Sequence, residues 1–111
     1  MKINRDETIK NHFDSITLLT GLLAKHKLSV IHHTYDYLCF GNWEIIVGAG
    51  HNDRRFIWDG RDFFLIVSDR KKNNLAHGRQ WKVAYELPIG EVSEKDLFEK
   101  VYQLAIEIKK N

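Results

Sequence analysis

The chain has 111 residues, enough for one domain with its own core and too few for two ordinary domains. Its hydrophobic fraction of 43% and charged fraction of 29% are ordinary for a globular domain. A formal net charge of +2 is too small to indicate a nucleic-acid partner, and no apolar run approaches the ~18 residues of a membrane span. We therefore expect a single domain over residues 1–111 and no membrane segment.

Cysteine usage and the N-terminus both favour the cytoplasm. Cys39 is the only cysteine, so no intrachain disulfide can form and a disulfide-stapled secreted scaffold is excluded. The first residues are polar and charged, with no apolar stretch behind them, so a signal peptide is not expected.

The first predicted element is a helix over about residues 6–25, with Asp6 as its N-cap. Apolar or small residues recur there at the three-and-four spacing of one helical face. These residues are Ile9, Phe13, Ile16, Thr20 and Leu23, with Leu19 beside them. Leu18 and Leu22 widen the stripe, so we expect a well-buried helix.

Two strands and a hairpin are predicted next. Residues 28–34 indicate a strand, and simple alternation would place Leu28, Val30, His32 and Thr34 on one face. A strand over 37–40, a reversal at Gly41-Asn42 and a strand over 43–47 would then follow, because turns of this composition tolerate positive φ.

A second hairpin is predicted around Asp59-Gly60, with arms over 56–58 and 61–67. A two-residue turn would place Trp58 opposite Arg61, where the two side chains could form a cation–π pair. The polar stretch 68–78 is interpreted as a loop, longer than most hairpin connections.

The last strand and the last helix have clear limits. Residues 80–87 alternate, with Trp81, Val83, Tyr85 and Leu87 expected on one face, and Pro88 ends the strand. Ser93 with Asp96 resembles a helix-capping arrangement. The buried face of the helix that follows is predicted to contain Leu97, Val101, Leu104, Ala105 and Ile108.

The order of helix, strands and helix, with no helix between strands, argues against a parallel sheet. We predict an α+β fold: an antiparallel meander of five to six strands with the N-terminal and C-terminal helices packed on one face. The sequence contains no internal repeat, low-complexity segment or interdomain linker.

Enzymatic function is not favoured, and we assign no catalytic residue, metal ligand or cofactor. Metal-binding spacings such as Cys-x-x-Cys or His-Glu-x-x-His do not occur. A metal-independent ribonuclease needs a base, an acid and a cation for the phosphate. Residues of these types are Glu44, His51, Asp53, Arg54, Arg55, Arg61 and Asp69.

Nucleic-acid binding is the alternative function. Residues 51–82 contain eight basic and four acidic side chains, a net charge of +4, whereas residues 83–111 have a net charge of −2. A basic region with an aromatic residue for stacking, here Trp81, is typical of RNA binding. The candidate contacts are Arg70, Lys71, Lys72, Arg79 and Lys82.

A protein-binding module is the preferred hypothesis, because Tyr, Trp and Arg are enriched at interface hot spots. Residues of these types crowd the two predicted hairpins: Tyr35, Tyr37, Trp43, Arg54, Arg55, Trp58 and Arg61. Size and composition are similar to those of small bacterial immunity and antitoxin proteins, without a motif match. The expected partner is another protein, a toxin being one candidate. The sequence leaves open the oligomeric state and whether the cluster is interface or core.

Overall fold

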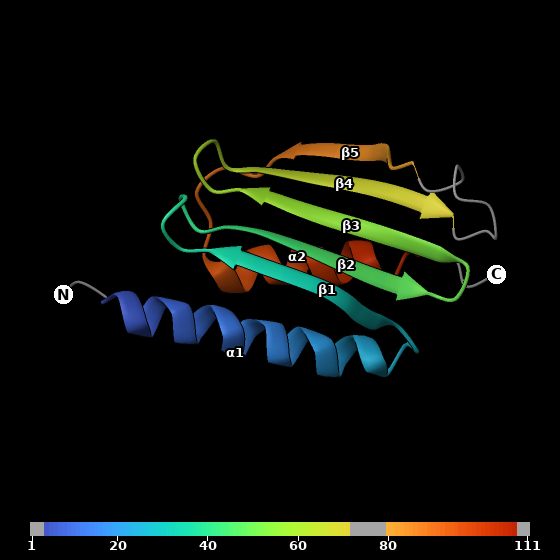
Figure 1. Ribbon diagram of the computed structural model, residues 1–111, viewed down its shortest axis with the longest axis horizontal. Helices are drawn as coiled ribbons and strands as arrows, with labels where there is room; N and C mark the ends of the chain where they lie inside the picture. The colour runs from blue at the N-terminus through green and yellow to red at the C-terminus, as the bar shows by residue number, and fades with distance from the viewer. Residues whose placement is uncertain (1–3, 72–79, 109–111) are drawn as a thin grey trace.

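The computed structural model describes residues 4–71 and 80–108. In chain order the elements are α1 (Arg5–Ala24), β1 (Ser29–Asp36), β2 (Asn42–Ala49), β3 (Asn52–Asp59), β4 (Phe64–Lys71), β5 (Lys82–Pro88) and α2 (Glu94–Ala105). The five strands form one antiparallel sheet in the order β1-β2-β3-β4-β5. Figure 1 shows α2 behind the sheet and α1 alongside β1. The predicted α+β fold is confirmed, with five strands in the described residues.

The core lies between the sheet and α2. Side chains that alternate along the central strands are almost fully buried, among them Ile45 and Val47 of β2 and Phe56 of β3, each 0% exposed. Val101 of α2 is also 0% exposed. Burying a side chain of this size contributes about 1.5–3 kcal/mol, so this layer dominates the stability of the fold.

Both helices begin with side-chain caps. The Ser93 hydroxyl accepts a hydrogen bond from the Asp96 amide at 3.1 Å, which confirms the predicted cap of α2. At the start of α1 the cap is Asn4, whose Oδ1 accepts from the Glu7 amide at 2.8 Å. The expected cap at Asp6 was wrong, because Asn4 already satisfies the first turn and Asp6 lies inside the helix.

Helix α1 is attached more lightly than its apolar sequence predicts. Its buried side chains are His12, Leu19 and Leu23, whereas Phe13 is 48% and Leu18 66% exposed. The expectation of a well-buried helix was wrong, because α1 runs alongside β1 rather than over the middle of the sheet (Figure 1). Neither described helix combines the length and apolar character needed to cross a bilayer.

A β-bulge in β1 changes which side chains face the helices. Val30 pairs with Val47 and His32 with Ile46, so Ile31 is an extra residue in the ladder. Beyond the bulge His33 pairs with Ile45, which is buried in the core, and His33 takes the inner face. The predicted alternation through His32 and Thr34 was therefore wrong from this point onward.

The predicted strand over 37–40 is a turn between β1 and β2. The Asp36 carboxylate accepts from the Cys39 amide at 3.1 Å, and the Asn42 amide donates to the Cys39 carbonyl at 2.9 Å. Phe40 and Gly41 have φ angles of 57° and 69°, which no strand residue adopts. Local hydrogen bonding by Asp36 thus outweighs the strand propensity of the apolar residues that follow.

The β3–β4 connection is the loop 60–63, not a two-residue turn. Asp59 pairs with Phe64 and Trp58 with Leu65, so the predicted pair of Trp58 with Arg61 does not form. The Asp59 carboxylate accepts from the amides of residues 61 and 62 at 3.0 and 3.2 Å, which widens the turn. The loop predicted to begin at residue 68 was also wrong at its start, because β4 continues to Lys71.

A second bulge lies between β4 and β5. Tyr85 pairs with Val67 and Val83 with Ser68, so Val83 lies on the opposite face from Tyr85, contrary to prediction. Pro88 ends β5 as predicted. One sheet face is not covered by the described helices, because α2 lies behind the sheet and α1 runs alongside β1 (Figure 1). We call this the outer face, and it includes Glu44, Ile46, Arg55, Ile57 and Ile66.

Candidate functional site

The two tryptophans predicted to contact a partner are core residues. Trp43 is 3% and Trp58 8% exposed, and their ring centroids lie 6.5 Å apart. Tyr35 is half-buried, with its ring stacked on that of His12 at a centroid distance of 3.8 Å. These three aromatic side chains support the interior of the hairpins, and they offer a partner little or no surface.

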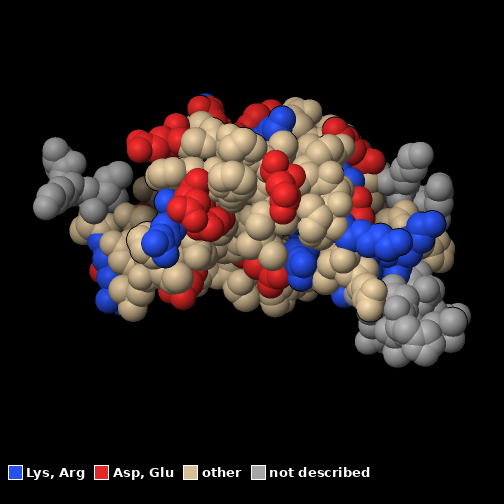
Figure 2. All heavy atoms as spheres, turned by 90° about the horizontal axis from the view of Figure 1, so that it is seen from above, with Lys and Arg blue, Asp and Glu red and all other residues tan. Residues whose placement is uncertain are grey.

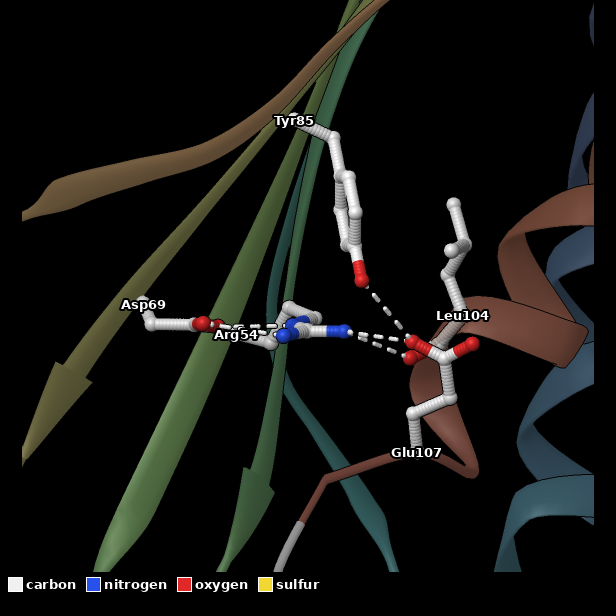
Figure 3. A network of polar contacts seen from close by, with 5 residues as sticks. All are labelled: Arg54, Asp69, Tyr85, Leu104 and Glu107. Atoms are coloured by element: carbon white, nitrogen blue, oxygen red, sulfur yellow. Dashed lines mark hydrogen bonds and ion pairs between the residues drawn. The ribbon is translucent and has the colours of Figure 1, made fainter.

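Arg54 is occupied by a network of polar contacts inside the fold (Figure 3). Its guanidinium donates to both carboxylate oxygens of Asp69 at 2.6 and 2.9 Å, and to the Leu104 carbonyl at 3.0 Å. Nη1 of Arg54 also lies 3.4 Å from a carboxylate oxygen of Glu107, just after α2. The guanidinium carbon lies 5.6 Å from the centre of the Tyr85 ring. The hydrogen bond to Asp69 raises the pKa of Arg54 against the opposing effect of burial. Arg54 therefore anchors α2 rather than a partner.

Arg55 lies on the outer face with two residues from the nucleic-acid candidate region. The guanidinium carbons of Arg55 and Arg70 lie 4.6 and 4.2 Å from the centre of the Trp81 ring. Arg70 also donates to the buried Asp53 carboxylate at 2.8 Å. Trp81 and Arg70 are thus engaged within the protein, which reduces what they can offer to a base or a phosphate.

The other nucleic-acid candidates form a smaller group than the sequence predicts. Lys71 and Lys82 are exposed where β4 ends and β5 begins, while Lys72 and Arg79 lie outside the described residues. Seen from the side of β5, Lys and Arg side chains gather near the right-hand end, whereas Asp and Glu side chains are scattered over the upper border, the centre and the lower edge (Figure 2).

The residues named for ribonuclease chemistry do not converge. Arg54 and Asp69 point towards α2, Glu44 and Arg55 lie on the outer face, and His51 follows the opposite end of β2 from the loop that contains Arg61. In the described part of the chain, no three His, Cys, Asp or Glu side chains are placed to hold a metal ion.

Two strongly exposed apolar side chains lie in the β1–β2 turn, at one end of the sheet. Leu38 is 87% and Phe40 62% exposed. The Arg61 guanidinium, from the β3–β4 loop, lies 5.9 Å from the centre of the Phe40 ring. We call this group, Leu38, Phe40 and Arg61, the turn-end tip. Sequence reasoning placed Arg61 among the contact residues but missed Leu38 and Phe40, because it assigned them to a strand.

The two turns that form the tip are held against each other. The Gly60 amide donates to the Asn42 side-chain oxygen at 2.7 Å. A Cβ atom built at Gly60 would lie 2.0 Å from the Phe40 carbonyl oxygen, so only glycine permits this approach. The tip is therefore fixed by backbone contacts, and little ordering entropy remains to be lost on binding.

A depression of about 570 Å³ adjoins the tip on the sheet. Its lining contains the carboxylate residues Asp36, Glu44 and Asp59 and the apolar residues Ile57 and Ile66. The complete lining is Thr34, Tyr35, Asp36, Asn42, Trp43, Glu44, Ile57, Trp58, Asp59 and Ile66. Apolar side chains with carboxylates around them suit the aliphatic stem and charged head of a Lys or Arg side chain.

Comparisons of the chain with protein-family models, curated proteins and solved structures found no match. The function is therefore argued from this geometry alone.

Proposed function

We propose that this protein is a small protein-binding module, most concretely an inhibitor or immunity-type protein that blocks another protein. The contact surface is the turn-end tip together with the adjoining depression. The observation that carries the proposal is the exposure of Leu38 and Phe40, at 87% and 62%, on turns that are held rigidly together. Large apolar side chains presented by a fixed backbone are what interface hot spots require.

The charge of the depression supports a partner with a basic surface. Asp36, Glu44 and Asp59 supply carboxylates beside the tip, although the chain as a whole has a net charge of +2. Inhibitors of basic proteins use acidic surfaces to accelerate association, so the local charge matters more than the total.

The alternative, an RNA-binding domain, is supported by the exposed pair Lys71 and Lys82. It is weakened by the contacts of Arg70 with Asp53 and Trp81, which neutralise one cation and occupy the aromatic ring. Binding through phosphates would fall about tenfold or more over a moderate rise in salt, whereas an apolar interface would change much less.

Affinity capture with matched variants tests the proposal. In the double variant Leu38→Ser with Phe40→Asn, Asn is chosen because it tolerates the positive φ of position 40. We expect this variant to lose at least about tenfold in affinity for a protein captured by the unmutated chain. The control Leu18→Ser changes an apolar residue of α1 that is 66% exposed and should capture the same protein undiminished.

Thermal unfolding should show both variants within about 0.5 kcal/mol of the unmutated chain, because these side chains are mostly exposed. Capture that survives the double variant would contradict the proposal. Recovery of RNA instead of protein, with loss of the RNA in Lys71→Ala/Lys82→Ala, would favour the alternative.

A further inference from the structure

His12 is a titratable side chain that the interface does not use, and it is completely buried. It projects from α1 with 0% exposure. Its ring stacks on Tyr35 at 3.8 Å and meets the edges of Phe13 and Phe98 at centroid distances of 5.7 Å each. A buried imidazole in an aromatic box can find partners only within the fold, and of its two nitrogens only Nε2 has a hydrogen bond.

The partner of one nitrogen is a second histidine. The Nε2 atoms of His12 and His33 lie 2.8 Å apart, a hydrogen-bond distance that requires one donor and one acceptor. On its other side, His12 Nδ1 lies 3.6 Å from an oxygen of Glu94 at the start of α2. A proton on Nδ1 faces this carboxylate favourably, so the neutral tautomer places the Nε2 proton on His33 and the acceptor on His12.

This geometry limits how many protons the pair can hold. One imidazolium can donate to one neutral imidazole, and Glu94 offsets that single positive charge. A second proton would place two N–H groups face to face at 2.8 Å, so the contact would break. Once the rings are detached from each other and exposed to water, neither blocks a proton on the other.

The ionisable groups around the pair, among the described residues, come from two elements. Glu94 belongs to α2, whereas Tyr35 and His32 belong to β1. Burial, followed by the charges of His12 and His32, lowers the pKa of His33. His32 lies on the outer face beside Glu44, at 3.0 Å, and is therefore outside the helix contact. The neighbouring Trp43 ring, 6.5 Å from that of His12, has no ionisable group.

The histidine pair is a large part of what attaches α1. The buried side chains of this helix are His12, Leu19 and Leu23. Elements with few buried apolar contacts open at lower free energy than the global unfolding of the protein. Because His12 is one of the three buried side chains of α1, weakening its contact with His33 should change how often α1 leaves the sheet.

We propose that the His12–His33 pair is a proton-sensitive latch, which holds α1 on the sheet at neutral pH and releases it in mildly acidic solution. The open form binds one more proton than the closed form, so acid favours opening. The equilibrium constant for opening rises by up to about tenfold for each pH unit below ~6.5. Release exposes the apolar surface beneath Leu19 and Leu23. The latch does not depend on the proposed partner contact.

Amide hydrogen exchange of the full chain tests the latch. Protection factors, corrected for the intrinsic pH dependence of exchange, are compared between about pH 7.5 and pH 5.5. We expect the amides around Asn11 to Leu19 in α1 to lose up to about tenfold protection per pH unit below ~6.5. Global unfolding also detaches α1 and takes up the same proton, so acid should weaken α2 as well; the latch predicts that the amides of Val101 to Ala105 in α2 stay more strongly protected than those of α1 at both pH values.

Two neighbouring histidines provide matched variants. In His33→Gln the side-chain amide does not titrate, and it can either donate to Nε2 of His12 or, turned over, accept from it, so closed and open forms can bind the same number of protons and the pH dependence of α1 protection should disappear. His32→Gln, one residue away on the outer face, should keep it. An unmutated chain whose α1 protection does not fall below ~6.5, or whose α1 and α2 amides are equally protected at both pH values, would overturn the proposal, as would the same pH dependence in His33→Gln. The lower protection of α1 than of α2 in the unmutated chain, together with its fall in acid, decides the question even if His33→Gln fails to fold.

Discussion

Two buried polar side chains connect the helices to the sheet, and they differ in how they respond to protons. Arg54 of β3 reaches α2 through the Leu104 carbonyl at 3.0 Å, while His12 of α1 reaches β1 through His33 at 2.8 Å. A guanidinium stays charged at any pH that a folded protein experiences, but an imidazole does not. The difference teaches that α2 is fixed and α1 is conditional, although both helices cover the same sheet.

The two anchors also differ in which partner is buried. The Arg54 side chain is 11% exposed, whereas those of Asp69 and Glu107 are 45% and 51% exposed. Water can therefore solvate the carboxylates if the cation is removed, but it cannot reach the cation if a carboxylate is removed. In the histidine pair His12 is the fully buried member, with 0% exposure, whereas His33 is partly exposed to solvent.

The largest expected effect comes from the Arg54 anchor. Asp69→Asn leaves a buried guanidinium without its main counter-charge, and we expect a loss of about 3 kcal/mol in the free energy of unfolding. Arg54→Met leaves only half-exposed carboxylates and fills the same space with an apolar chain, so the loss should be smaller, about 1–2 kcal/mol. Urea unfolding at neutral pH measures both.

The order of the two losses is the critical result. A larger loss for Arg54→Met than for Asp69→Asn would show that the exposure of the carboxylates does not control the cost. In that case the difference in stability between the two variants would need another cause.

The next effect is the response of stability to acid. The folded pKa of His33 is lowered from 6.5, so the unfolded chain binds more protons in the window below that value. Stability is therefore complete above ~6.5, falls as the pH drops towards the folded pKa, and then levels off. The limit is about 1.4 kcal/mol per pH unit, and the partial exposure of His33 should keep the slope below it.

Urea unfolding as a function of pH measures this slope. His33→Gln should flatten the curve in this window, and His32→Gln should leave most of it. An equal flattening in the two variants would mean that the outer-face histidine, not the buried pair, causes the acid sensitivity.

The smallest effect concerns Gly21 in α1. A Cβ atom built there meets nothing within 4 Å, so Gly21→Ala should stabilise the helix by about 1 kcal/mol. The protection of α1 amides should rise at every pH, with an unchanged dependence on pH, because the histidine pair is untouched. A change in the pH dependence would indicate that the helix stability of α1 and the protonation of the histidine pair are coupled.

The fold was predictable where local signals agree with the tertiary contacts. Ser93 and the apolar spacing of Leu97, Val101 and Leu104 specify α2 without reference to the sheet. The strand signals failed at Leu38 to Phe40, where apolar residues indicated a strand. Hydrogen bonds that the Cys39 amide donates to Asp36 make this segment a turn instead. Such side-chain competition depends on atomic geometry that propensity does not contain.

The sites were less predictable, because their members are brought together over long sequence distances. A single bulge at Ile31 turns His33 towards the helices, and His12 lies 21 residues away in the chain. Simple strand alternation, in which every second residue points to the same face, predicted that His32 would face the helices instead. The turn-end tip depends equally on the contact between Gly60 and Phe40, which lies between two turns that sequence treats as independent.

Nitrogen-detected NMR of the histidine rings in the unmutated chain tests the central claim most directly. At neutral pH we expect Nε2 of His33 to be protonated and Nε2 of His12 to accept, at the 2.8 Å separation of the pair. On acidification the pair should gain one proton while α1 stays closed, and the second only as the α1 amide signals change. Protonation of both rings while the α1 signals stay unchanged would contradict the account.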